Sequence, residues 1–319
     1  MKVGKMKRPV FEIWFKTAGA RLIIAAAALL FYLPPLPIVF TGFITPASAA
    51  QDTGAEYEVS GKIMDIFDET RIYKAVVSFD DEQFLTGASG HFSAKLKPGV
   101  YKFSVTCEGY YPRVINNFAV ESNEEYDQYI IPQSFDLEIY KKFNAYSGLL
   151  PKFANPPQII IGTGKYNGSK NSFSSEQIDS INSVISQLKS ISDFFSRSTV
   201  VKRDIESAKD IPEDAIVICR DDFANYTEGG HAEHHGWKRS HLIVVNPLHN
   251  RLKGFFEVVL RHELMHAIGF YIHVPPETDS ILVPTFPIPP DYTALDRKVI
   301  KLFYRMPSKV SYPHATDGK

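Results

Sequence analysis

The sequence predicts an α+β domain that follows a small all-β sandwich domain. Apolar residues alternate with polar ones up to about residue 132, as in half-buried strands, and beyond it they also recur at helical spacing. A length of 319 residues favours two domains, and 44% hydrophobic with 22% charged residues is typical of a folded globular chain. The formal net charge of -1, without a basic stripe, argues against nucleic-acid binding.

Residues 1–49 are predicted to be a signal peptide or membrane anchor. A basic start over residues 2–8 precedes an apolar run over residues 22–40, and Ala47-Ser48-Ala49 then fits a signal peptidase site. Because the apolar run is long, the alternative is an uncleaved anchor that spans the membrane. Either form predicts export, so we expect a secreted, periplasmic or cell-envelope protein of a bacterium.

Residues 50–135 are predicted to form a β-sandwich accessory domain. The segments 92–96 and 101–107 alternate apolar and polar residues, and turn residues lie between them. The stretch resembles the transthyretin-like or carboxypeptidase-regulatory-like β-sandwich, which implies a module that is not itself catalytic. The matching residues are 59–63, 90–92, 99–101 and 109–111.

Residues 136–319 are predicted to form the α+β domain. Ser174 can cap a helix, with Gln177 completing a capping box. Short apolar runs predict strands at 158–162, 215–219 and 242–245. Strands that alternate with helices along this stretch predict helices packed against a sheet.

The strongest chemical signal is the run from His262 to His273, which reads H-E-x-x-H-x-x-G-x-x-x-H. Residues four apart lie on one face of a helix, so His262 and His266 can bind one Zn²⁺. Glu263 follows the first ligand and is predicted to be the catalytic base toward a zinc-activated water. Gly269 can end the helix, after which the chain can return with His273 as third zinc ligand.

The helix that carries this motif has an apolar stripe of its own. Phe256, Leu260, Leu264 and Ile268 recur every fourth residue and predict one buried face. The two histidines of the motif lie off this stripe. They are therefore expected to face a cleft while the stripe packs into the core.

This region resembles the metzincin metallopeptidases. His262, Glu263, His266 and Gly269 match the family pattern position for position, whereas His273 lies one residue later than the pattern requires. The resemblance implies a zincin-type peptidase fold over residues 136–319, a catalytic zinc ion and hydrolysis of peptide bonds. A zincin variant in which Glu277 or Asp279 supplies the third ligand is the alternative arrangement of the metal site.

The turn after the motif also carries the resemblance. Residues 279–284 are similar to the methionine turn of the family, with Leu282 in the methionine's place as an apolar floor under the metal. The closing helix of the family matches residues 293–305, where Thr293 is the predicted cap. Tyr292 is a candidate for stabilising the oxyanion of the reaction.

Two further groups of residues need an interpretation. Cys107 and Cys219 fall in different predicted strands, so each is predicted to be a small buried residue and no disulfide framework is expected. Four histidines follow Gly229-Gly230 and are predicted to lie in a solvated loop, with a second metal site as the alternative. They are His231, His234, His235 and His241.

The sequence therefore predicts an exported zinc metalloendopeptidase. Its expected partners are a protein or peptide substrate and, if the first segment stays uncleaved, the membrane. The rival from another class is a non-catalytic envelope protein, for binding or structure, that retains the zincin fold.

Overall fold

The computed structural model describes residues 54–143, 152–166, 168–170, 172–221, 230–235, 240–246, 254–285 and 287–306. The predicted targeting segment at residues 1–49 lies outside these ranges. Within them, none of the helices combines the length and the apolar composition that a membrane crossing needs.

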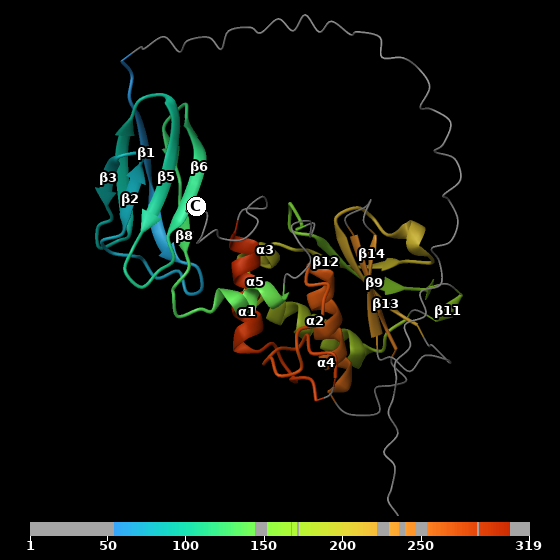
Figure 1. Ribbon diagram of the computed structural model, residues 1–319. Coiled ribbons are helices and arrows are strands. Elements are labelled where there is room, and N and C mark those ends of the chain that lie inside the picture. Colours follow the sequence, from blue (N-terminus) through green and yellow to red (C-terminus); the bar gives the residue numbers. More distant parts are fainter. Residues whose placement is uncertain are drawn as a thin grey trace, which may run out of the picture. The chain divides into compact units, whose positions relative to one another are not determined.

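The first part of the described chain is a β-sandwich (Figure 1). Its strands are β1 (Tyr57–Asp65), β2 (Val76–Phe79), β3 (Glu82–Leu85), β4 (His91–Leu96), β5 (Gly99–Thr106), β6 (Arg113–Val120), β7 (Glu124–Glu125) and β8 (Gln128–Ile130). One sheet has the order β4-β1-β7, with β8 also paired to β1, and the other has the order β3-β2-β5-β6. The predicted all-β character of this region is confirmed.

Apolar side chains from both sheets form the core of the sandwich. The ring of Phe79 lies 5.3 Å from that of Phe103 and 5.7 Å from that of Phe118, measured between centroids. Phe92 and Leu96 on β4 are buried, as their alternation predicts, because successive side chains of a strand point to opposite faces. The sandwich is thus held by a cluster of aromatic rings between its two sheets.

The prediction that Cys107 is a buried strand residue is met only in part, because its side chain packs against the sandwich core but is not fully buried. Strand β5 ends at Thr106, and Cys107 is half-buried because the chain turns there, with the Tyr110 amide donating to the Cys107 carbonyl at 3.2 Å. Burial raises the pKa of its thiol. Cys219 is buried in a strand of the second part, as predicted, and neither of these two described cysteines forms a disulfide.

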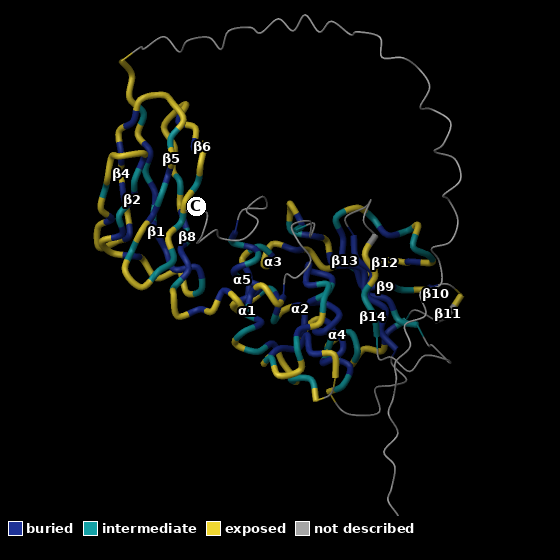
Figure 2. The backbone as a smooth tube through the Cα atoms, viewed as in Figure 1, coloured by how far each residue is buried: buried dark blue, intermediate teal, exposed yellow. Residues whose placement is uncertain are grey.

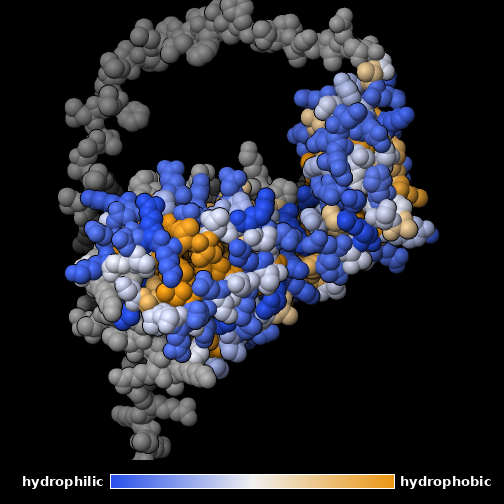
Figure 3. All heavy atoms as spheres, turned by 180° about the vertical axis from the view of Figure 1, so that it is seen from behind, coloured by the Kyte–Doolittle hydropathy of each residue, from blue (hydrophilic) through white to orange (hydrophobic). Residues whose placement is uncertain are grey.

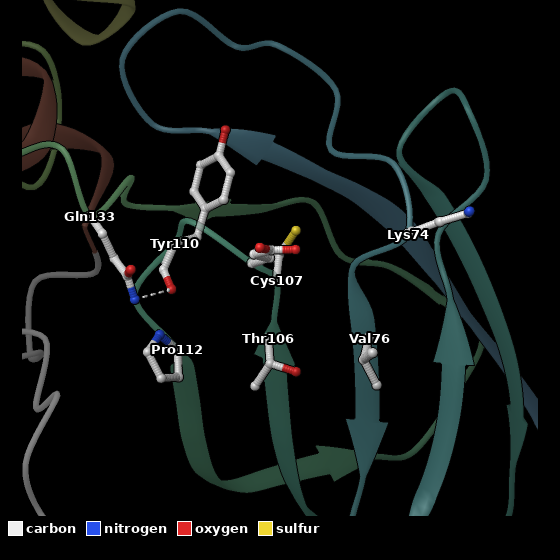
Figure 4. A pocket seen from close by; sticks show the side chains of 8 residues that line it. Lys74, Val76, Thr106, Cys107, Tyr110, Pro112 and Gln133 are labelled. Carbon is white, nitrogen blue, oxygen red and sulfur yellow. Dashed lines mark hydrogen bonds between the residues drawn. The ribbon is translucent and has the colours of Figure 1, made fainter.

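A surface hollow of about 320 Å³ lies where β2 begins and β5 ends (Figure 4). On one side of the hollow, the side-chain amide of Gln133 donates from Nε2 to the Tyr110 carbonyl at 3.2 Å. Its lining mixes polar and apolar residues, namely Lys74, Val76, Thr106, Cys107, Glu108, Tyr110, Pro112 and Gln133. The hollow does not contain the motif residues of the predicted catalytic site.

The second part is a mixed sheet with helices. Its elements are α1 (Leu137–Phe143), β9 (Gln158–Thr163), β10 (Lys165–Tyr166), β11 (Ser169–Lys170), α2 (Ser175–Ile191), α3 (Asp193–Ser196), β12 (Val200–Asp204), η1 (Ala208–Asp210), β13 (Ala215–Arg220), β14 (Gly230–His235), β15 (Ser240–Val245), α4 (Phe255–Ala267) and α5 (Ala294–Arg305). The sheet order is β12-β9-β13-β15-β14, and only β14 runs antiparallel to its neighbour among these described strands. The predicted α+β class is confirmed.

The central strands β9, β13 and β15 of this sheet are buried on both faces, which explains their continuous apolar runs (Figure 2). Ile216, Ile218 and Ile243 face the cluster that also contains the apolar residues of α2, α4 and α5. Val217 and Leu242 face a smaller cluster on the other side. Viewed from behind, the described surface is largely hydrophilic, and its most extensive hydrophobic area lies over the part that carries sheet and helices (Figure 3).

Local signals begin the helices where the sequence predicts them. Ser174 caps α2, and its hydroxyl accepts from the Gln177 amide while the Gln177 side chain accepts from the Ser174 amide. Thr293 caps α5 in the same reciprocal way with Asp296. The division into residues 50–135 and 136–319 stays a prediction.

The predicted histidine loop is a strand instead. His231, His234 and His235 belong to β14, which pairs with β15 from Gly230↔Val245 to His235↔Ser240. His241 lies in β15 and is buried. The ladder of backbone hydrogen bonds to β15 orders this segment, and its glycine- and histidine-rich composition gave no sign of that pairing.

Candidate metal centre

Helix α4 and the loop after it bring three imidazole rings together. The Nε2 atom of His262 lies 3.0 Å from Nε2 of His273 and 3.2 Å from Nε2 of His266. The remaining pair, His266 and His273, is separated by 3.4 Å. Among the residues that the structure describes, these three histidines form the group whose ligand atoms lie close enough together to hold a metal ion.

The backbone explains how residues eleven positions apart meet. His262 and His266 lie one turn apart on α4, with ring centroids 4.8 Å apart. Gly269 follows the helix with φ +119°, a conformation that side chains rarely allow, and a Cβ there would lie 3.0 Å from the ring of Phe303. The chain can turn tightly at this glycine, and His273 returns to the helix despite its late position in the motif.

Backbone carbonyls orient two of the three rings. His262 Nδ1 lies 2.6 Å from the Ile281 carbonyl oxygen, and His266 Nδ1 lies 2.6 Å from that of Phe270. A carbonyl oxygen only accepts, so Nδ1 carries the proton in both rings. In the neutral imidazole, Nε2 then presents a lone pair toward the centre of the group, which is the form that binds a metal.

Burial favours the same uncharged form. Loss of solvent lowers the pKa of His262 to about 4 and that of His266 to about 3, and it also lowers the pKa of His273. These rings are therefore neutral at pH 7. At zinc–nitrogen distances of about 2.0–2.1 Å, tetrahedral ligands have nitrogens about 3.3–3.4 Å apart. The separation of 3.4 Å matches this spacing, and the other two, 3.0 and 3.2 Å, are slightly shorter.

Glu263 lies beside this group without belonging to it. Its side chain is 7% exposed, and its Cγ would lie 3.4 Å from a Cβ placed on Gly230, at the start of β14. The carboxylate is thus carried on the part of α4 that faces β14, the edge strand of the described sheet. Its assignment as catalytic base stays a prediction.

The turn under the group contains the residues that the sequence singled out. Leu282 is fully buried in the same core cluster as α4, and its carbonyl accepts from the Val274 amide at 3.1 Å. It therefore supplies apolar bulk to the turn whose Ile281 carbonyl contacts His262, and its equivalence to a family methionine stays a prediction. Glu277 and Asp279, the alternative oxygen ligands, are exposed and lie outside the group of three histidines.

The suggestion that Tyr292 stabilises an oxyanion is wrong. Its side chain is 3% exposed, and its hydroxyl finds no hydrogen-bond partner in the described part of the chain. Burial raises its pKa far above the usual value. A hydroxyl enclosed in the core cannot reach a substrate.

Two of the histidines singled out in the sequence, His234 and His241, form a cluster with Tyr271, which sequence reasoning missed. The Tyr271 hydroxyl lies 3.4 Å from Nε2 of His241, and the two rings stack with centroids 5.7 Å apart. The His234 ring lies 4.6 Å from that of His241. This cluster connects β14 and β15 to the loop after α4, and no spacing in the sequence points to the part that Tyr271 takes in it, because Tyr271 comes from a separate segment.

Gly230 is the point of closest approach between β14 and α4. A Cβ there would lie 2.9 Å from Val259 Cγ1 and 3.0 Å from the Val244 carbonyl oxygen, so Gly230→Ala forces the strand away from the helix. We expect a loss of about 1–3 kcal/mol in the free energy of unfolding, measured by denaturant titration. Gly87→Ala is the control, since the nearest atom there is 3.9 Å away. Equal stability of the two variants would contradict the close approach.

The comparisons with known proteins leave the function open. No protein-family model and no curated protein matches this sequence. A chain of a mutant type II cohesin–X-dockerin complex from Acetivibrio cellulolyticus aligns at 20% identity with 22% of this chain and 51% of its own length, with a TM-score of 0.19.

Two Bacteroides structures show a similar partial likeness. A candidate carbohydrate-binding protein from Bacteroides uniformis aligns at 18% identity over 25% of this chain and 43% of that one, with a TM-score of 0.22. A candidate membrane-associated protein from Bacteroides fragilis aligns at 14% identity over 41% and 40%, with a TM-score of 0.22. This chain spans about half or less of each structure, and such scores assign no function.

Proposed function

We propose that this protein is an exported zinc-dependent metalloendopeptidase. The observation that carries the proposal is the convergence of three Nε2 atoms, from His262, His266 and His273, within 3.4 Å of one another. Two of the rings are held by carbonyls in the tautomer that a metal requires. Three histidine ligands leave a fourth zinc position for water or substrate, as a catalytic site needs.

The chain's own residues then have separate roles. Zinc, when bound, supplies a Lewis acid that activates a water molecule and polarises the scissile carbonyl. Glu263 accepts the proton of the attacking water at its carboxylate and passes it to the nitrogen of the leaving amine. Its burial beside the group supports this role, because a purely structural metal site has no use for a buried carboxylate that is not a ligand.

The sheet supports a peptide as substrate. Strand β14 lies at the edge of the described sheet and begins beside Glu263. An extended peptide can add to such an edge through its main chain, which places a peptide bond near the metal without requiring a particular side chain. We therefore propose extended protein or peptide segments as the substrate class.

Metal removal and return test this proposal. The full chain is purified, its zinc content is measured, and hydrolysis of casein and of a mixed peptide library is followed by mass spectrometry. We expect one zinc per chain, loss of cleavage with 1,10-phenanthroline and recovery when Zn²⁺ is added back. Zinc binding without cleavage of any peptide would instead support the alternative of a non-catalytic envelope protein. A chain that binds no zinc would refute the proposed metal site.

A further inference from the structure

Asp296, the capping-box partner of Thr293 in α5, has no exposed surface. A capping-box carboxylate does not need to be buried so completely. Its side chain is 0% exposed, although it lies in the first turn of the helix. Burying a charge is costly unless hydrogen bonds satisfy it. Burial also raises its pKa, and the hydrogen bonds that it accepts oppose this effect.

The carboxylate is satisfied by donors from two segments. The Thr293 amide donates to Oδ2 at 2.9 Å, which completes the helix cap. The Thr293 hydroxyl also reaches Oδ2, at 2.9 Å. Two further donors come from the turn that contacts His262: the Ser280 hydroxyl reaches Oδ1 at 2.6 Å and the Ile281 amide reaches Oδ2 at 3.1 Å. Asp296 therefore ties the turn to the start of α5.

From this carboxylate, a continuous chain of hydrogen bonds leads to His262. The Ser280 hydroxyl, which donates to Asp296, accepts from the Leu282 amide at 3.0 Å. That amide belongs to the same peptide unit as the Ile281 carbonyl, which accepts from His262 Nδ1 at 2.6 Å. The plane of the peptide between Ile281 and Leu282 is thus held on both sides, by Ser280 and by the imidazole.

We propose that Asp296 is a positioning residue for the metal centre, acting through Ser280 and the Ile281–Leu282 peptide to set the tautomer and ring orientation of His262. The inference rests on the proposed metal site. Carboxylates that act behind a metal-bound histidine orient the ring and raise its basicity. Here the carboxylate acts through one hydroxyl and one peptide unit, and hydrogen bonds in such a chain polarise one another.

The second helical ligand provides an internal comparison. His266 Nδ1 donates to the Phe270 carbonyl, and the Phe270 amide donates back to the Met265 carbonyl at 3.1 Å. This support is local to the end of α4 and includes no contact with Asp296. Loss of the Asp296 carboxylate should therefore disturb His262 and leave the tautomer of His266 unchanged.

Asp296→Asn is the sharpest test because it preserves size. The amide NH₂ of Asn cannot accept the hydrogen bonds that Ser280 and Ile281 now donate to two carboxylate oxygens. We expect zinc affinity, measured by chelator competition on the full chain, to fall about 10–100-fold. In the metal-free protein, long-range ¹H–¹⁵N spectra of the imidazoles should show His262 losing its single Nδ1-protonated form.

Two further variants separate positioning from general loss of stability. Ser280→Ala removes the next link of the chain and leaves the sequence of α5 unchanged, so it should weaken zinc binding in the same direction even if Asp296→Asn does not fold. Ile300→Val trims the core of the same helix and should lower the melting temperature with unchanged zinc affinity. Comparable affinity loss in all three variants, or no change in Asp296→Asn and Ser280→Ala, would overturn the inference.

The outcomes also separate this inference from the proposed function. If the unmodified chain binds zinc and Asp296→Asn binds it equally well, only the positioning role fails. If the unmodified chain binds no zinc, the proposed function fails, and the imidazole spectra still decide the positioning role. A His262 tautomer that is the same in the variant and in the parent protein would refute it, and a changed tautomer would support it.

Discussion

Glu263→Gln is expected to slow peptide hydrolysis by about 10²–10⁴-fold, the range that a positioned acid or base contributes. The amide cannot take a proton from the attacking water, yet it has nearly the same size as the carboxylate. Because Glu263 lies outside the group of three histidines, zinc content should stay at the parent value. The measurement combines zinc analysis of the purified full chain with kcat/KM on the best library peptide.

Glu257→Gln is the matched control on the same helix. Glu257 accepts from the Ser180 hydroxyl at 2.7 Å, which ties α4 to α2 at the opposite end from the metal ligands. Its replacement should leave kcat/KM close to the parent value. Hydrolysis that survives in Glu263→Gln would exclude Glu263 as the base. Loss of zinc in that variant would mean that the carboxylate supports the metal site directly.

The second large effect is expected for His273→Ala, which removes the ligand whose place in the motif is shifted. Zinc affinity should fall by more than the roughly 10–100-fold cost of outer-shell changes, since a direct ligand is lost. Zinc at 100 times its Kd stabilises a folded protein by about 2.7 kcal/mol, so the parent chain should melt at a higher temperature when zinc is added. In the variant, this zinc-induced increase should disappear.

His91→Ala is the control for this experiment. His91 is an exposed histidine on β4 of the sandwich and is not part of the metal group, so its loss should change neither zinc affinity nor the increase in melting temperature. Full zinc binding by His273→Ala would place the third ligand elsewhere. Glu277 and Asp279 would then be the next residues to replace, although both are exposed outside the group.

The local elements of this protein follow from short-range patterns in the chain. The stripe of Phe256, Leu260 and Leu264 predicts α4, and all three side chains are buried there. Thr293 and Ser174 begin their helices as capping residues. Such patterns are readable because helix and strand periods, and the reach of a capping side chain, extend over only a few residues.

Long-range pairing explains where sequence reasoning failed. The segment that begins at Gly230 was predicted to be a loop, because its strand character depends on pairing with β15. Tyr292 was a reasonable candidate near the turn, yet the packing of the core encloses it. Burial of a single side chain depends on neighbours from distant segments, and no periodic pattern encodes them.

The metal centre shows the same division. By itself, the sequence determined that His262 and His266 share a helix face, that Gly269 can end the helix, and which apolar residues lie inside, since each rests on local geometry. Only the tertiary structure decided that His273 reaches the other two rings and that Asp296 lies behind His262. Those contacts join residues up to 19 positions apart, from His262 to Ile281, and their distances depend on how α4, the turn and α5 pack together.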